Sequence, residues 1–177
     1  MITLTRITTP YCDAYRFTEE LLTTAFPRDE YRNLPEQRAN VAEKKEFHLM
    51  LACHQGEPVG FISYWELGDF CYVEHLATLP SQRGKGYGKS ILEQLQKTAE
   101  KIVLEVEEPT DELSSRRITF YRRAGFELCN IPYQQPPYRK GDGYQPMFLM
   151  FHGWDADGAN YEKAKQAIYK NIYNLYK

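Results

Sequence analysis

A run of three glycines at alternate positions, flanked by two segments of different periodicity, constrains the fold more than any other part of this sequence. The run is Arg83-Gly84-Lys85-Gly86-Tyr87-Gly88, followed by Lys89 and Ser90. It comes after a β-like segment, Phe70 to Leu79, and opens an amphipathic helical pattern that ends near Ala99. We therefore expect a strand, a tight glycine turn and the first turn of a helix. Converging N–H groups and the helix dipole bind anions at such a place, phosphate above all.

Three glycine patterns that bind phosphate can be compared with this segment residue by residue. A Walker A loop needs a glycine where the chain has Arg83, and a dinucleotide-binding fingerprint needs one where it has Lys89. The third pattern is Gln or Arg, two residues, Gly, one residue, and Gly or Ala, which Arg83, Gly86 and Gly88 satisfy. This is the pyrophosphate loop of the GNAT acetyltransferase superfamily, which the chain resembles. Taken by itself, the segment also fits a glycine-rich basic surface turn.

Further segments follow the order and spacing of that family. Tyr72 to Pro80 stands at the place of the family's fourth strand, before the loop. Ile102 to Val106 stands at the place of the fifth strand. Phe120-Tyr121-Arg122-Arg123-Ala124-Gly125-Phe126 matches the family's later helix and its exit, with Gly125 suited to the position just beyond a helix C-terminus. The resemblance spans roughly Leu49 to Met150.

Hydrophobic periodicity predicts the remaining elements. The expected strands are Ile2 to Thr8, Phe47 to Cys53, Val59 to Trp65, Phe70 to Leu79, Ile102 to Val106, Phe126 to Ile131 and Met147 to Phe151; the expected helices include Tyr11 to Thr24, Leu34 to Lys44, Gly86 to Ala99 and one from about Ala159. We expect a single domain over residues 1–177, of mixed α/β class. Its central sheet would be mostly antiparallel, with about seven strands and helices on both faces. The resemblance implies that the fourth and fifth strands splay apart and hold the cofactor's pantetheine arm.

Two segments near the C-terminus leave alternatives open. Pro132 to Gly141, rich in proline and tyrosine, is expected to be an irregular loop, either functional or a rigid surface excursion. The last helix carries one stripe of Ala164, Ile168, Ile172 and Leu175 beside another of Tyr169, Tyr173 and Tyr176. So wide an apolar face must pack on its own domain or on a partner subunit. The chain is accordingly expected to be a monomer or a homodimer.

Composition limits the other classes of function. The formal net charge is −2, which argues against a general nucleic-acid binder or a protein of anionic membranes. Apolar runs fall far short of the roughly 18 residues of a membrane span, and the N-terminal residues lack the apolar core of a signal peptide. The four cysteines, Cys12, Cys53, Cys71 and Cys129, have no paired spacing. We expect reduced thiols, no metal site and a cytoplasmic location.

The resemblance implies acetyl-CoA as the acetyl donor and an amine as the acceptor. The predicted cofactor contacts lie in the fourth strand, the glycine loop and the later helix. They are Leu76, Ala77, Thr78, Arg83, Gly84, Lys85, Gly86, Tyr87, Gly88, Lys89, Ser90 and Ser114. The backbone of Leu76 to Thr78 would pair with the pantetheine amides, and Gly84 to Lys89 would supply N–H groups to the pyrophosphate. Arg83 and Lys85 are either phosphate ligands or solvated charges.

Glu74 is the first candidate for the base that takes a proton from the acceptor amine, because a protonated amine cannot attack. At roughly 3.3 Å per residue, it lies about 16 Å before the strand's end at Leu79, near the thioester end of the arm. A carboxylate inside an apolar strand is costly unless it is paired or useful. The alternative is a structural, salt-bridged glutamate. The neighbouring His75 reads as a core histidine.

Tyr121 matches the family's tyrosine general acid, which would protonate the leaving CoA thiolate; the alternative is a packed aromatic residue. Family members often carry Asn seven residues and Ala four residues before this tyrosine. Here those places hold Ser114 and Arg117, and the larger, charged Arg117 puts the local cofactor contacts in doubt. A backbone N–H near Leu76 or Ala77 would stabilise the oxyanion.

Near the fifth strand's end the chain places five acids within eight residues, Glu105, Glu107, Glu108, Asp111 and Glu112. They would either attract a cationic amine or form a solvated acidic turn, and the solvated turn is favoured. The predicted function is therefore an N-acetyltransferase acting by direct attack in a ternary complex. A non-catalytic acyl-CoA sensor is the second hypothesis and a phosphate-loop nucleotide hydrolase the third. The acceptor side would be built from Phe26 to Leu34, Trp65 and Tyr133 to Gly141.

Overall fold

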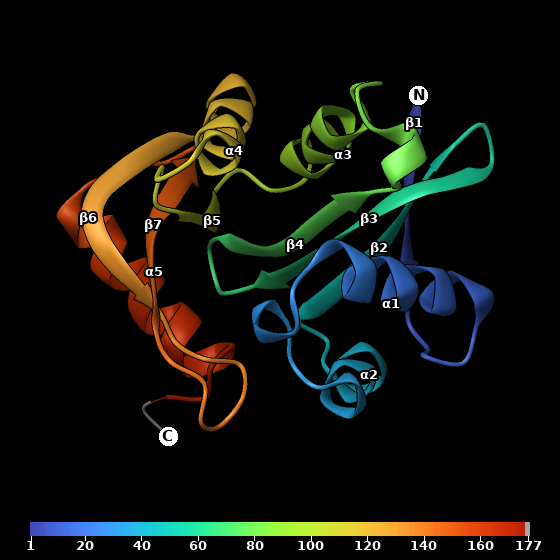
Figure 1. Cartoon of the computed structure of the whole chain (residues 1–177), viewed down its shortest axis with the longest axis horizontal. Coiled ribbons are helices and arrows are strands. Elements are labelled where there is room, and N and C mark those ends of the chain that lie inside the picture. Colours follow the sequence, from blue (N-terminus) through green and yellow to red (C-terminus); the bar gives the residue numbers. More distant parts are fainter. Residues whose placement is uncertain (176–177) are drawn as a thin grey trace. The chain divides into compact units, whose positions relative to one another are not determined.

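The computed structural model describes residues 1–175, which form seven strands and five α-helices (Figure 1). In chain order the elements are β1 (Ile2–Ile7), α1 (Asp13–Ala25), η1 (Arg28–Glu30), α2 (Leu34–Glu43), β2 (Phe47–His54), β3 (Glu57–Glu66), β4 (Cys71–Thr78), η2 (Pro80–Gln82), α3 (Tyr87–Gln96), β5 (Ile102–Glu107), α4 (Glu112–Arg123), β6 (Glu127–Gln135), β7 (Gln145–His152) and α5 (Gly158–Asn171). The strand order is β1-β2-β3-β4-β5-β7-β6. The predicted class, a mixed α/β fold with a seven-stranded sheet, is confirmed.

The chain forms two compact units. The first comprises residues 1–66 and 73–98, and the second comprises residues 67–72 and the chain from Ala99 onward. Strand β4 therefore begins in the second unit, with Cys71 and Tyr72, and ends in the first. The expected single domain over residues 1–177 stays a prediction, and so does the splaying of the fourth and fifth strands.

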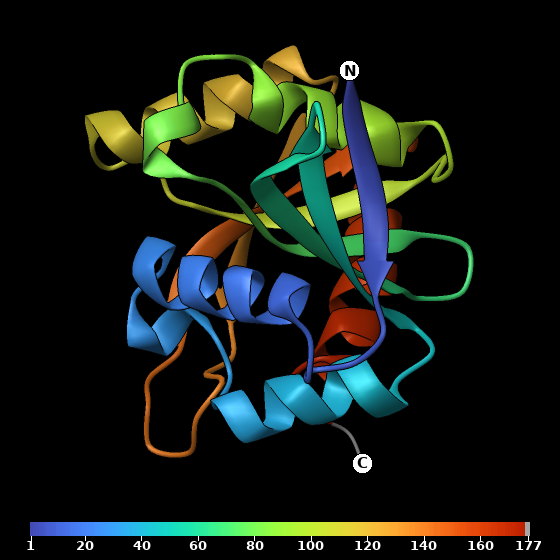
Figure 2. The same cartoon turned by 90° about the vertical axis from the view of Figure 1, so that its right-hand side faces the viewer.

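In the first unit, β1, β2 and β3 are antiparallel neighbours, with Ile2 opposite His54 and Phe47 opposite Trp65. Helices α1 and α2 lie on one face of these strands and α3 lies on the other (Figures 1 and 2). The buried side chains of α1 recur at the spacing that brings them to one face of a helix, namely Tyr15, Thr18, Leu21 and Leu22. The helix ends at Ala25 because Pro27 cannot continue it.

Gly60 sits where β3 passes close to the end of β4. A Cβ at this position would fall on the carbonyl oxygen of Ala77 and 3.1 Å from the Cα of Thr78. Both obstacles are backbone atoms, so no side-chain rotation can relieve them. We expect Gly60→Ala to lower the free energy of unfolding by roughly 1–3 kcal/mol, measured by urea titration. Gly143→Ala is the control, because its Cβ would meet no atom within 4 Å; equal effects of the two substitutions would contradict this account.

In the second unit, β7 pairs antiparallel with both β5 and β6. Helices α4 and α5 lie on opposite faces of these strands (Figures 1 and 2). The buried residues of α5 include Tyr161, Ala164, Ile168 and Tyr169. The Tyr161 ring lies 6.4 Å from that of Tyr133 in β6. The apolar face of the last helix thus packs on the chain's own strands, which answers the question that the sequence left open; Tyr176, assigned to this stripe, lies outside the described residues.

The prediction of an irregular loop from Pro132 to Gly141 is partly wrong. Strand β6 continues through Gln135, so the first four residues of that segment are strand and Tyr133 is fully buried. A register shift between Cys129 and Tyr133 accommodates Pro132, which has no N–H to donate. Its carbonyl accepts a hydrogen bond from the Tyr161 hydroxyl at 2.9 Å. Because β6 stands at the end of the strand order, the missing donor costs no ladder partner on the outer side.

Within the described part of the chain, no helix combines the length and apolar character needed to cross a membrane. All four cysteines lie in that part and are free thiols. Cys129 is buried, whereas the other three are half-buried.

Candidate active site

The glycine turn between β4 and α3 has the backbone conformation that its sequence predicts. Gly84 and Gly86 both have φ of 78°, in the left-handed region that favours glycine. Gly86 is the N-cap residue of α3, and no side chain of the described residues caps this helix. A Cβ on either glycine would meet no atom within 4 Å. Helix α3 therefore begins without a side-chain cap, and the unpaired N–H groups of a first helical turn suit an anion.

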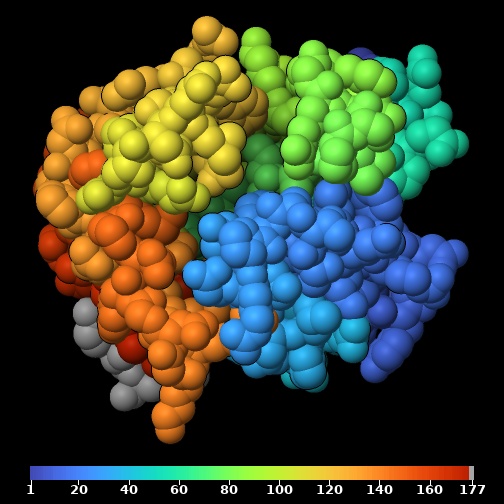
Figure 3. All heavy atoms as spheres, viewed as in Figure 1, coloured from blue at the N-terminus to red at the C-terminus, as the bar shows by residue number. Residues whose placement is uncertain are grey.

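The cations of this segment are solvent-exposed. The Lys85 ammonium donates to the Gln82 side-chain oxygen at 2.8 Å, and the Lys89 ammonium lies 3.6 Å from Glu93. Arg83 is exposed and has no side-chain partner among the residues that the structure describes. The segment with the loop and α3, light green in Figure 3, lies on the molecular surface. Tyr87 and Ser90 are half-buried in the first turn.

The stretch of β4 that is predicted to pair with the pantetheine arm, Leu76 to Thr78, lies in the first unit. Leu76 and Thr78 are half-buried, while Ala77 is 8% exposed. The Leu79 N–H donates to the Val59 carbonyl at 2.9 Å, which fixes the end of the strand against β3. Pairing of Leu76, Ala77 and Thr78 with a cofactor stays a prediction.

Glu74 forms a buried ion pair with Arg32, which no local pattern of the sequence indicated. The Arg32 guanidinium donates to both carboxylate oxygens, at 3.1 Å through Nη1 and by a shorter contact through Nη2. The Trp65 indole N–H donates to the same carboxylate at 3.0 Å. The side chains of Arg32 and Glu74 are 2% and 0% exposed. Arg32 also donates to Gln37 at 2.6 Å, so the guanidinium is held from two sides.

This environment keeps Glu74 ionised. Burial alone would raise the pKa of Glu74, but the charges of Arg32 and His75, with hydrogen bonds from Arg32 and Trp65, outweigh it and lower the pKa below its usual value. A carboxylate with a lowered pKa is a weak base. These contacts favour the salt-bridged alternative, although the catalytic role of Glu74 stays an untested prediction. His75 is a core histidine as expected, with Nε2 2.8 Å from the Glu30 carbonyl.

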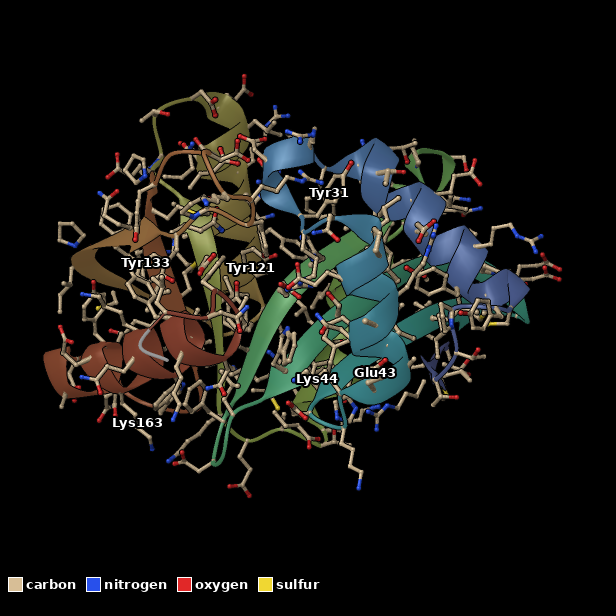
Figure 4. The ribbon with its side chains drawn as sticks, turned by 90° about the horizontal axis from the view of Figure 1, so that it is seen from below. Tyr31, Glu43, Lys44, Tyr121, Tyr133 and Lys163 are labelled. Atoms are coloured by element: carbon tan, nitrogen blue, oxygen red, sulfur yellow. The ribbon has the colours of Figure 1, made fainter. Side chains whose placement is uncertain are left out.

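Tyr121, labelled in Figure 4, projects from α4 in the second unit. Its ring packs edge-on against Phe120 and Phe126, with centroids 5.1 and 5.7 Å apart. The residue is half-buried, and its hydroxyl has no hydrogen-bond partner among residues 1–175. Burial raises the pKa of Tyr121, against an opposing effect of Arg117. The phenol therefore stays protonated at neutral pH, as a proton donor must.

Ser114 is committed to the N-terminus of α4. Its hydroxyl donates to Asp111 Oδ1 at 2.7 Å and accepts from the Asp111 N–H at 3.2 Å, which completes a capping box. The residue is 2% exposed. A contact between Ser114 and the cofactor stays a prediction, and it would require this cap to open. Arg117, the departure from the family pattern, pairs with Glu107 at 3.0 Å.

The predicted solvated acidic turn does not hold for all five of its members. Asp111 caps α4, and Glu107 and Glu112 pair with arginines. Glu105 instead points into a cluster of tyrosines and a glutamine, where Tyr133 donates to it at 2.6 Å. Sequence reasoning missed this site because the partner residues are 28 to 68 positions away along the chain. The one local signal was an acid at a buried-strand position, between Leu104 and Val106.

The structure groups the candidate residues by unit. Glu74, the Leu76 to Thr78 stretch and the glycine loop belong to the first unit, whereas Tyr121 and Ser114 belong to α4 in the second. Of the residues expected on the acceptor side, Trp65 and Tyr133 are 3% and 0% exposed. Both are therefore packed within their units.

Comparison with known proteins gives a consistent result. The model of the acetyltransferase (GNAT) family matches residues 13–126. A solved structure from Bacteroides thetaiotaomicron, assigned to the GNAT family of acetyltransferases, is 43% identical and superimposes with a TM-score of 0.93 over 98% of this chain and 99% of that one. Among curated protein sequences, none matches.

More distant solved structures share the fold. The ribosomal-protein-S18-alanine N-acetyltransferase from Escherichia coli is 20% identical, with a TM-score of 0.62 over 86% of this chain and 93% of that one. A GNAT family acetyltransferase from Elizabethkingia anophelis, solved with acetyl-CoA bound, is 17% identical, with a TM-score of 0.57 over 85% of this chain and 97% of that one.

Proposed function

The chain belongs to the acetyltransferase (GNAT) family, and on that premise we propose that it transfers an acetyl group from acetyl-CoA to a primary amine by direct attack in a ternary complex. The observation that carries the proposal is the glycine turn, in which Gly84 and Gly86 are left-handed and α3 begins at Gly86 without a side-chain cap. Such a turn suits a pyrophosphate. The acetyl-CoA bound in the Elizabethkingia anophelis structure supports the same cosubstrate.

The residues that would hold the cosubstrate form two groups. The N–H groups from Gly84 to Lys89, with the exposed Arg83 and Lys85 beside them, would bind the pyrophosphate. The backbone of Leu76 to Thr78 would bind the pantetheine arm, and an N–H at Leu76 or Ala77 would meet the charge that develops on the acetyl oxygen. When bound, acetyl-CoA supplies the acetyl group and a thiolate leaving group. Tyr121 would give that thiolate its proton, because its hydroxyl is protonated and has no partner among the described residues.

Gly86→Ala is expected to weaken acetyl-CoA binding about tenfold. An alanine costs of order 1–2 kcal/mol in the left-handed conformation that this turn needs, and 1.4 kcal/mol is a factor of ten in affinity. Isothermal titration calorimetry with acetyl-CoA measures the effect. Gly56→Ala is the matched control, because Gly56 has φ of 85°, equally open surroundings and a place in the β2–β3 turn.

The calorimetry also tests the proposal itself. Saturable acetyl-CoA binding that Gly86→Ala weakens and Gly56→Ala leaves unchanged supports it. Binding that is absent, or that both variants weaken equally, would contradict the assignment of the pyrophosphate to this turn.

A further inference from the structure

Glu105 in β5 is the centre of a polar cluster in the second unit, which we call the Glu105 cluster: Tyr72, Glu105, Tyr133, Gln135 and Tyr173. The Tyr133 hydroxyl donates to one carboxylate oxygen at 2.6 Å. The Tyr173 hydroxyl lies 3.0 and 3.2 Å from the two oxygens. Gln135 donates to Glu105 through Nε2, and Tyr72 contributes a further hydrogen bond. Four neutral donors, contributed by β4, β6 and the segment after α5, thus converge on one carboxylate.

Within the described part of the chain, no cation is paired with this carboxylate. Among residues 1–175, no lysine, arginine or histidine forms an ion pair with Glu105. The contrast with Glu74 is direct, since that carboxylate is locked to a buried guanidinium. The two buried glutamates therefore have opposite environments. Two carboxylates whose surroundings push their pKa values apart are the usual mark of divided roles.

The groups around the cluster are aromatic, and the titratable ones are phenols. Tyr169 of α5 packs its ring 5.8 Å from Tyr133, and Tyr138 packs 5.2 Å from Tyr173. On β7 the residue opposite Glu105 is Leu149, which is fully buried. A cation, Lys165, lies against one of these rings, with its ammonium 5.6 Å from the centre of the Tyr169 ring. Tyr169 in turn packs on Tyr133, a partner of the carboxylate, so Lys165 does not reach Glu105 directly. Glu105 as a residue is half-buried, and its carboxylate lies among these hydroxyl and amide donors.

We infer that Glu105 is the group that takes the proton from the acceptor's ammonium. In this step an N–H bond of the ammonium breaks and an O–H bond forms on the Glu105 carboxylate. The nitrogen lone pair is then free to attack the acetyl carbon, and the C–S bond breaks with its electron pair on sulfur. Tyr121 protonates that sulfur and is restored by the second proton that the nitrogen loses. Glu105 returns its proton to water. The inference rests on the acetyl transfer proposed above.

The ionisation of Glu105 supports this role. Burial raises the pKa of Glu105 above its usual value, although the hydrogen bonds from Tyr133, Gln135, Tyr173 and Tyr72 oppose the shift. A carboxylate with a raised pKa is a stronger base than one at its usual value. A folded-state pKa above the unfolded one contributes stability at acidic pH and loses it as pH rises through the folded value. Above its folded-state pKa, the ionised Glu105 that catalysis needs thus costs stability.

Glu105→Gln is the decisive variant, because glutamine keeps the size and one acceptor oxygen while removing the base, and tyrosine hydroxyls can donate or accept. We expect kcat/KM to fall about 100-fold for the amine that the wild type acetylates among aminoglycosides, polyamines, amino acids and peptides with free N-termini. The acidic limb of the pH profile should disappear, while the Kd for acetyl-CoA stays within about twofold. At pH 8 the melting temperature of Glu105→Gln should equal or exceed that of the wild type. Any excess over the wild type should shrink toward pH 4.5.

Tyr133→Phe gives a second, milder test. Removing its hydrogen bond, which lowers the Glu105 pKa, should move the acidic limb of the profile to higher pH without abolishing turnover. Glu74→Gln is the comparison, since Glu74 is the other candidate base. An acidic limb that survives in Glu105→Gln, whether or not Glu74→Gln removes it, overturns the inference.

The experiments distinguish a failure of the proposed acetyl transfer from a failure of the role of Glu105. A wild-type protein that binds acetyl-CoA and acetylates no amine would overturn acetyl transfer and the role of Glu105 together. A wild-type enzyme that works, with a Glu105→Gln variant that works equally well at every pH, would overturn the role of Glu105 alone.

Discussion

Replacing Arg32 with methionine is expected to lower the free energy of unfolding by about 3–5 kcal/mol at neutral pH. The substitution keeps much of the apolar stem between Phe47 and Trp65, whose ring centroids lie 5.9 and 5.7 Å from the guanidinium carbon. It removes the charge that faces Glu74, whose side chain is fully buried. The carboxylate then loses its charge partner while it keeps the hydrogen bond from the Trp65 N–H. Urea titration monitored by tryptophan fluorescence measures the loss.

The pH dependence separates this mechanism from a general packing defect. In the wild type the lowered pKa of Glu74 means that its contribution is present above the unfolded pKa and is lost as pH falls through the folded one. Without Arg32, burial raises that pKa, and Glu74 takes up a proton. The difference in the free energy of unfolding between Arg32→Met and the wild type should therefore narrow toward pH 4. A gap that stays constant with pH would contradict the ion-pair account.

Two further variants serve as controls for the loss of stability in Arg32→Met. Arg38→Met removes an arginine from a pair with Glu19 whose side chains are 46% and 17% exposed, and its effect should be much smaller because solvent screens it. The double variant Arg32→Met with Glu74→Leu removes both buried charges together. It should recover a large part of the lost stability, since replacing a whole buried pair by apolar residues is often neutral.

Tyr121→Phe is expected to lower kcat by about 10²–10³, the contribution typical of a general acid. The ring contacts with Phe120 and Phe126 do not involve the hydroxyl, so folding should be intact. Acetyl-CoA affinity should change by less than about twofold, because the hydroxyl acts on the leaving thiolate and not on the pyrophosphate. Steady-state kinetics with calorimetry measures both quantities.

Tyr144→Phe is the matched control for Tyr121→Phe. It removes the hydroxyl of a tyrosine in the same unit that is 53% exposed. An unchanged kcat in Tyr121→Phe, or an equal loss in the control, would remove Tyr121 from the mechanism.

Local sequence patterns were enough to predict most of the fold. The glycines at positions 84 and 86 and the helical pattern behind them gave the turn and the start of α3 correctly, because backbone conformation at φ of 78° depends on residue type. The strand at Pro132 could not be predicted in this way, because its conformation depends on distant parts of the chain. Proline normally ends a strand, and only the register shift of β6 and its place at the end of the strand order make room for it.

In the candidate site, only the residues that stand in short local motifs could be proposed from the sequence. The glycine loop and Tyr121 stand in short motifs, whereas the partners of the buried glutamates come from distant segments. Arg32 and Glu74 are 42 positions apart, and Tyr173 and Glu105 are 68 apart. A single sequence shows that Glu74 and Glu105 occupy apolar strands. It does not show that one meets a guanidinium and the other meets hydroxyl groups, which is what decides their ionisation.

The most direct test of acetyl transfer is the release of free thiol from acetyl-CoA in the presence of a panel of amines, with Tyr121→Phe beside the wild type. The panel should include aminoglycosides, polyamines, amino acids and peptides with free N-termini. Acetyl transfer predicts release with at least one class of amine, formation of the acetylated product in equal amount, and loss of both in the variant. Saturable acetyl-CoA binding with no thiol release from any class would contradict it, and would favour a protein that senses the acyl-CoA without reacting.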